Sequence, residues 1–160
     1  MLALLRSLFV NMITIRDIDK NRRIWDFLNS APRFRFIVIR DDSFDEDIPH
    51  VNVGHLISCY LKEHQMSKES INGAKDFLLN QIVENTQTEQ EYGKYICLTN
   101  VGILFEKNLD FVPTEFLANI SKNTTLLLHW PGEIVLQKLF FLEEGSKFFI
   151  DLKNINYITI

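Results

Sequence analysis

Three short, almost wholly apolar segments constrain the fold of this chain most strongly. They lie at residues 34–39, 94–99 and 124–130. The first reads Phe-Arg-Phe-Ile-Val-Ile, so its alternating start becomes a continuous apolar run. Such a run is typical of a strand that is covered on both faces of a sheet. Strands of this kind separated by helices predict a three-layer α/β fold with a mostly parallel sheet.

The segments between these strands have helical periodicity. Apolar side chains recur in them three or four positions apart, which predicts helices over residues 17–29, 54–64, 68–85 and 113–121. Pro113 suits the first turn of the last helix, because proline lacks the amide hydrogen that would be unpaired there. We also expect a short strand at 50–53 and a surface loop at 86–91. Antiparallel strands are expected at the C-terminal end, at residues 139–142, 147–152 and 157–160.

The length and composition suit one globular domain. The chain has 160 residues, of which 46% are apolar and 24% charged, so general disorder is excluded. No repeat or linker divides it, so we expect a single α/β domain over 1–160. In it, a helical N-terminal extension covers 1–30 and the core covers 34–160.

The net charge and the cysteine content indicate which partners and which cellular compartment to expect. A net charge of −4 argues against unaided binding of nucleic acid, because Lys and Arg contacts to phosphate supply most of that affinity. A local basic face remains an alternative to a solvated one, because five arginines gather between residues 22 and 40. No apolar run approaches the roughly 20 residues of a membrane span. With two cysteines and no signal-peptide pattern, we expect a cytoplasmic protein with reduced thiols.

The segment that follows the first strand carries no phosphate-loop motif. Residues 40–47 read Arg-Asp-Asp-Ser-Phe-Asp-Glu-Asp, without the glycines and lysine that hold a triphosphate. Carboxylates are ligands for Mg²⁺ or Ca²⁺, so one alternative function is a small divalent-metal-dependent enzyme or nuclease-like domain that uses loop 41–47. The weak candidate ligands are Asp41, Asp42, Asp45 and Asp47.

The histidines and cysteines form no recognisable catalytic or zinc motif. His55 and Cys59 are four positions apart on one expected helix, but two ligands do not make a zinc site. We expect a packed histidine beside a buried thiol there, and Cys97 reads as a small core residue of a strand.

Trp130, Pro131 and Gly132 end the expected central strand. An exposed tryptophan is a favoured interface anchor, whereas the alternative is a strand terminus whose tryptophan packs over the sheet edge. Leu5, Leu8 and Phe9 lie in an expected amphipathic helix at the N-terminus. These six residues are the candidate partner-binding residues.

Two stretches carry a family resemblance. One is His-Val-Asn-Val-Gly-His-Leu-Ile-Ser at 50–58, and the other runs from Tyr95 to Gly132. In order and spacing they resemble the small P-loop subunit of BREX-type bacteriophage-exclusion systems. That family pairs a Walker A loop and helix with a Leu-Asp-Asn strand end, a helix ending in Ser-Arg-Asn and a strand ending in Trp-x-Gly. The resemblance covers roughly residues 34–152.

The departures from the family imply a degenerate nucleotide site. Residues 41–49 are too short for a phosphate loop and its helix, Thr99-Asn100 replaces the Walker B-like acid, and Lys122 replaces the arginine. Arg40, Asn100 and Lys122 are therefore read as vestigial nucleotide-site positions on a degenerate P-loop scaffold. A nucleotide-binding protein with an unusual loop is a further alternative.

We therefore expect an interaction subunit of a bacterial multi-protein defence or DNA-processing complex, without catalysis or cofactor of its own. The missing catalytic motifs, the aromatic richness and the resemblance together favour this function. The expected partner is a larger subunit such as an ATPase or a nuclease, with nucleic acid contacted only through the complex and no membrane contact.

Overall fold

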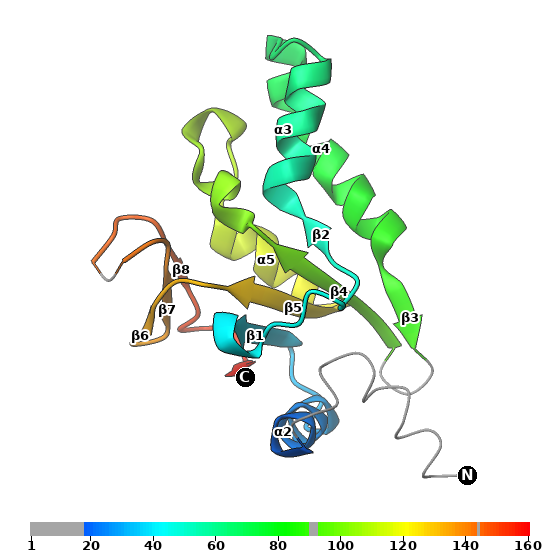
Figure 1. The fold of residues 1–160 in the computed structure, drawn as a ribbon, viewed down its shortest axis with the longest axis vertical. Coiled ribbons are helices and arrows are strands. Elements are labelled where there is room, and N and C mark those ends of the chain that lie inside the picture. Colours follow the sequence, from blue (N-terminus) through cyan, green and yellow to red (C-terminus); the bar gives the residue numbers. More distant parts are fainter. Residues whose placement is uncertain (1–17, 90–92, 144) are drawn as a thin grey trace.

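The protein has a mixed α/β architecture, in which a mostly parallel sheet carries helices on both faces and a smaller antiparallel sheet lies beside it (Figure 1). The computed structural model describes residues 18–89, 93–143 and 145–160. Across the main sheet the strand order is β2-β4-β5-β1-β9, and β3 pairs with β4 outside this path. The expected α/β class with a largely parallel sheet is confirmed.

The helices begin where local signals in the sequence place them. Within the described ranges, the α-helices are α2 (Ile18–Asn29), α3 (Val53–Glu63), α4 (Lys68–Asn85) and α5 (Pro113–Ser121). The Asn52 side-chain oxygen accepts a hydrogen bond from the His55 amide and caps α3, and Ser67 caps α4 through the amide of Ser70. Pro113 occupies the first turn of α5. The expected helices 68–85 and 113–121 are confirmed to the residue.

The parallel strands of the main sheet are β1 (Phe36–Arg40), β2 (Val51–Asn52), β4 (Gly93–Thr99), β5 (Thr125–Trp130) and β9 (Tyr157–Thr159). β5 is central, and it pairs with β1 on one side and with β4 on the other. The carboxyl ends of β1, β4 and β5 consequently lie at one edge of the sheet and their amino ends at the other. We call these the carboxyl edge and the amino edge.

Two expectations about the strands are wrong. The expected loop 86–91 contains β3 (Gln87–Glu89), which forms an antiparallel hairpin with β4. The expected antiparallel strand at 157–160 is instead β9, which pairs in parallel with β1. Parallel pairing lets Ile158 and Ile160 pack with the buried residues of β1. The antiparallel C-terminal addition is confirmed only for the second sheet, which holds β6 (Ile134–Val135), β7 (Lys138–Phe140) and β8 (Phe149–Asp151).

The alternation of side chains along the buried strands divides the core into two layers. Val38 and Leu128 pack on the face that α3, α4 and α5 cover. Ile37 and Leu127 pack on the opposite face, where Ile24 of α2 lies. Burial on both faces explains why these strands are apolar at nearly every position.

None of the helices within the described ranges combines the length and the apolar character that a membrane span requires.

Candidate functional site

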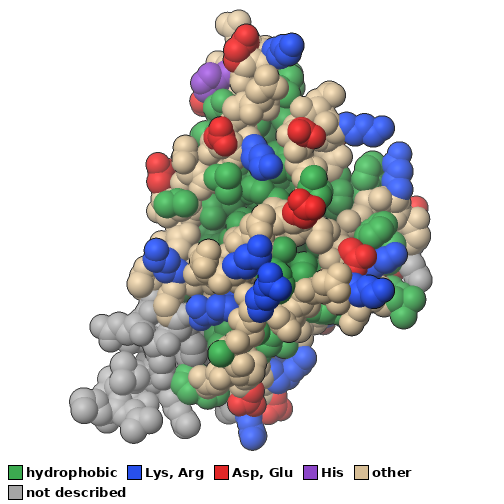
Figure 2. Space-filling model, turned by 180° about the vertical axis from the view of Figure 1, so that it is seen from behind, with side chains coloured by type: hydrophobic (Ala, Val, Ile, Leu, Met, Phe, Trp, Pro, Cys, Tyr) green, Lys and Arg blue, Asp and Glu red, His purple; other side chains and the backbone are tan. Residues whose placement is uncertain are grey.

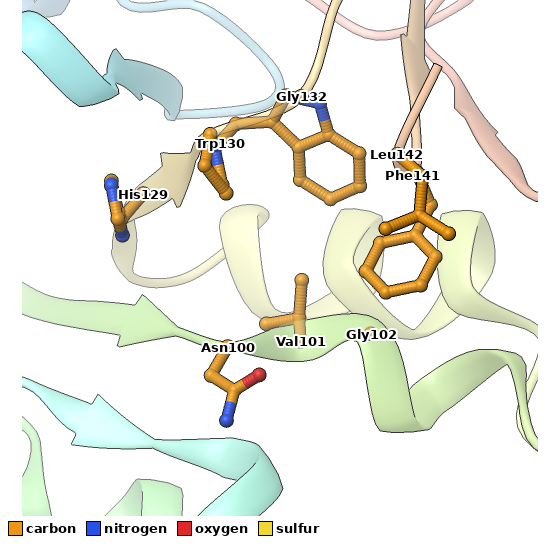
Figure 3. A pocket seen from close by; sticks show the side chains of 9 residues that line it. Asn100, Val101, Gly102, His129, Trp130, Gly132, Phe141 and Leu142 are labelled. Carbon is orange, nitrogen blue, oxygen red and sulfur yellow. The ribbon is translucent and has the colours of Figure 1, made fainter.

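A small cavity opens at the carboxyl edge of the sheet, between the ends of β4 and β5 and the second sheet (Figure 3). Its volume is about 220 Å³. Side chains of Trp130, Phe141 and Leu142 lie on one side of it, and Asn100 and Val101 lie on the other. The lining residues are Asn100, Val101, Gly102, His129, Trp130, Pro131, Gly132, Phe141 and Leu142. The carboxyl ends of parallel strands are where open α/β sheets usually bind their ligands, so this cavity is the candidate site.

Trp130 forms a buried wall of the cavity and is not the exposed anchor that one interpretation of the sequence required. Only 2% of it is exposed, and its ring centroid lies 6.5 Å from that of Phe141. Its Nε1 is buried without a hydrogen-bond partner among the described residues, and it faces Gly132. The structure therefore supports the alternative interpretation, in which this tryptophan packs at the end of the strand.

The other candidate partner-binding residues lie in different places. Pro131 is exposed and Gly132 is half-buried, and both line the cavity rim. A Cβ on Gly132 would stand 2.2 Å from the Phe140 carbonyl oxygen, so only glycine lets the segment after β5 pass this close to β7. Leu5, Leu8 and Phe9 lie outside the described residues.

Asn100 joins the end of β4 to the start of α3. Its backbone is left-handed, with φ of 51° and ψ of 49°, a conformation that Asn tolerates better than most residues. Its Nδ2 donates a hydrogen bond to Asn52 Oδ1 at 3.1 Å, and its carbonyl accepts from the Gly54 amide at 3.0 Å. Asn100 therefore ties the end of β4 to the start of α3 through both its side chain and its backbone.

His129 lies at the end of β5 and is covered by the segment that follows β1. Its Nε2 donates a hydrogen bond to Asp41 Oδ1 at 2.9 Å, and its ring stacks on Phe44 with centroids 4.1 Å apart. Phe44 also meets the edge of His50, and Ile48 is 4% exposed. Residues 41–50 consequently pack onto the sheet.

The acidic residues of loop 41–47 do not come together as a metal site. Asp41 is held by His129, Asp42 accepts from Ser43 Oγ at 3.3 Å, and Asp45 accepts from the Asp47 amide at 3.0 Å. Within the described ranges, no group of three or more His, Cys, Asp or Glu side chains is arranged to hold a metal ion. The proposed ligand set Asp41, Asp42, Asp45 and Asp47 is therefore not supported.

The three vestigial positions do not form one site. Arg40 is exposed at the carboxyl edge, where its amide donates to the Ile160 carbonyl, and Asn100 lies at the same edge. Lys122 precedes β5 and lies at the amino edge, where its Nζ donates to Asn119 Oδ1 at 2.7 Å. A strand of six residues such as β5 spans roughly 20 Å, so Lys122 is too far away to contribute to a site with the other two.

The two cysteines occupy contrasting environments. Cys59 Sγ lies 3.6 Å from His55 Nε2, but His55 is exposed and Cys59 is half-buried, so the expectation of a buried thiol there is wrong. Cys97 is 1% exposed in β4, as expected, and burial raises the pKa of its thiol to about 12. Since the thiolate is the reactive form, Cys97 is inert in the folded protein.

Titration with a thiol reagent at pH 8 should modify one cysteine of the native protein. Cys59 should react first and Cys97 only after unfolding in guanidinium, and Cys59→Ser should remove the native reaction. Rapid native modification of Cys97 would contradict its placement in the core.

The free energy of unfolding should fall as the pH rises above about 9, because the unfolded chain can ionise the Cys97 thiol while the folded chain cannot.

Several lining residues were not foreseen from the sequence. Val101 begins the 3₁₀ helix η2 (Val101–Phe105), and Phe141 and Leu142 follow β7 of the second sheet, whose position no local pattern specifies. The contact between Asp41 and His129 could have been found, because each residue ends or follows a parallel strand, and adjacent strands bring such ends together.

The chain matches no family model, no curated protein and no solved structure.

Proposed function

We propose that this chain is a non-catalytic interaction subunit of a bacterial multi-protein assembly for defence or DNA processing. Its carboxyl edge would serve as a docking site for a larger protein, such as an ATPase or a nuclease. Its scaffold would be a P-loop-like one without a Walker A loop.

The observation that carries this proposal is the packing of residues 41–50. In a P-loop protein a glycine-rich loop and a helix follow the first strand and present amides to phosphate. Here the 3₁₀ helix η1 (Asp41–Ser43) follows β1, and Phe44 and Ile48 then pack against the sheet. The space beside β1 is thus filled by side chains, and carboxylates stand where a triphosphate would lie.

The cavity supplies a docking point at the same edge. Its walls are mainly apolar, and Leu142 at its rim is 75% exposed. An exposed apolar rim around a concave apolar surface suits a buried side chain of a protein partner.

Co-purification with the products of the native neighbouring genes tests this proposal. Leu142→Asp should reduce recovery of the partner at least tenfold, because it places a charge at the rim of an apolar cavity. Leu136→Asp is the matched control: Leu136 is an 89% exposed leucine that also has a positive φ but does not line the cavity. This control should leave recovery unchanged.

A thermal-shift assay with ATP and GTP completes the test. Neither nucleotide should raise the melting temperature. A nucleotide-dependent rise that Asn100→Ala abolishes would instead favour the nucleotide-binding alternative. A partner-free monomer with full biological activity would contradict the docking role.

A further inference from the structure

Exposed basic side chains gather at the amino edge of the main sheet, opposite the cavity. Lys94 precedes Tyr95, which pairs with Thr125 at the start of β5, and Lys122 stands just before β5. Arg33 stands just before β1 on the other side of β5. Adjacent strands are about 4.8 Å apart, so the three segments lie within roughly 10 Å of one another across the sheet. We call Arg33, Lys94 and Lys122 the amino-edge cluster.

Two members of the amino-edge cluster share one aromatic ring. The Arg33 guanidinium carbon lies 5.3 Å from the centre of the Phe34 ring, and Lys122 Nζ lies 5.9 Å from it. Phe34 is 9% exposed, so a core residue holds both cations at the surface. Lys94 and Ile96 are two positions apart on β4, so their side chains point to the same face of the sheet. The side chain of Ile96 packs on the face that α5 covers. Lys122 follows the end of α5, so both lysines belong to this face.

The members of the amino-edge cluster make no short ion pair with a carboxylate of the described residues. None of its members is in an ion pair within 4.0 Å among those residues, and the Lys122 ammonium donates to an amide oxygen instead. Figure 2 shows Lys and Arg side chains gathered over the lower half of the face seen from behind, below the projecting helices. Like charges gathered at one edge repel one another, and a bound polyanion would relieve that repulsion.

We infer that the amino-edge cluster binds the sugar–phosphate backbone of nucleic acid without reading its sequence. Along the axis of a duplex each strand carries one phosphate per about 3.4 Å, so three cations on long side chains that span roughly 10 Å can contact up to three phosphates. Lys and Arg contacts to phosphate position a nucleic acid but carry no sequence information. The inference does not depend on the cavity, and it assigns to this chain a direct contact with nucleic acid.

Fluorescence anisotropy with the full chain tests the inference, using labelled oligo(dT) of 20 nucleotides and a 20-base-pair duplex in 50 mM salt. We expect weak binding, with a Kd of about 100 µM or tighter. The logarithm of the association constant should fall with the logarithm of the salt concentration with a slope of about −2 to −3, as three phosphate contacts require. The two probes show whether single or double strands are preferred.

The triple variant Arg33→Gln, Lys94→Gln, Lys122→Gln should weaken binding at least tenfold and flatten the salt dependence. The control triple variant Lys62→Gln, Lys75→Gln, Lys107→Gln changes three exposed lysines elsewhere and alters the net charge equally. It should bind as the parent chain does, and melting curves should show that both variants are folded.

Three results would overturn the inference. These are no binding of either probe at 100 µM protein in 50 mM salt, equal loss in the two triple variants, or equally tight binding of a polyglutamate peptide. Partner recovery in the co-purification assay is measured separately, so failure here leaves the docking proposal standing.

Discussion

Replacement of Trp130 by alanine should lower the free energy of unfolding by about 3–5 kcal/mol, the usual loss for a buried aromatic side chain. The indole is 2% exposed and fills the space between the end of β5 and Phe141, which directly follows β7. Removing it leaves a void that merges with the adjoining cavity. Urea unfolding monitored by far-UV circular dichroism measures the loss.

Leu142→Ala is the matched control for this prediction. Leu142 lines the same cavity but is 75% exposed, so its removal should change stability by less than about 0.5 kcal/mol. Trp130→Phe should lose less than Trp130→Ala because most of the packing is kept. If Trp130→Ala proved as stable as the parent chain, the burial of this tryptophan, and with it the cavity wall, would be refuted.

Gly132→Ala should lower the free energy of unfolding by about 1–3 kcal/mol, the usual cost of an overpacked site. The new methyl group would stand 2.2 Å from the Phe140 carbonyl oxygen, which belongs to the backbone of β7. A backbone atom cannot rotate away, so the segment after β5 must move away from β7, and we expect a loss in the upper part of this range. Urea unfolding measures it.

Gly102→Ala makes the same chemical change at a second cavity residue. Its methyl group would meet a ring carbon of Phe141 at 2.4 Å, but that side chain can turn aside. A smaller loss is therefore expected for Gly102→Ala. A larger loss there than for Gly132→Ala would contradict the close contact between Gly132 and the backbone of β7.

Local signals in the sequence predicted the helices well. Ser67 and Pro113 mark the beginnings of α4 and α5 by satisfying or removing amide hydrogens, and both helices have the expected bounds. The buried strands were predicted equally well, because burial on both faces leaves a continuous apolar run. Such features depend on neighbours within a few positions of the chain.

Features that depend on distant partners were not predicted. The pairing of β9 with β1 is decided by the whole sheet, and the polar Gln87–Glu89 segment becomes a strand only because β4 lies beside it. Trp130 is buried because the second sheet folds against it. Lys122 was grouped with Arg40 and Asn100 through the family resemblance alone, although it precedes its strand while the other two follow theirs.

The hydrogen bond between Asn100 and Asn52 has a mechanical consequence. Asn52 caps α3, and α3 and α4 project from the sheet as a pair (Figure 1). Any tilting of this arm about its base must displace Asn52 and pull on the amide that lines the cavity. A protein that bound the far end of α3 and α4 and tilted them would therefore also change the shape of the cavity opening.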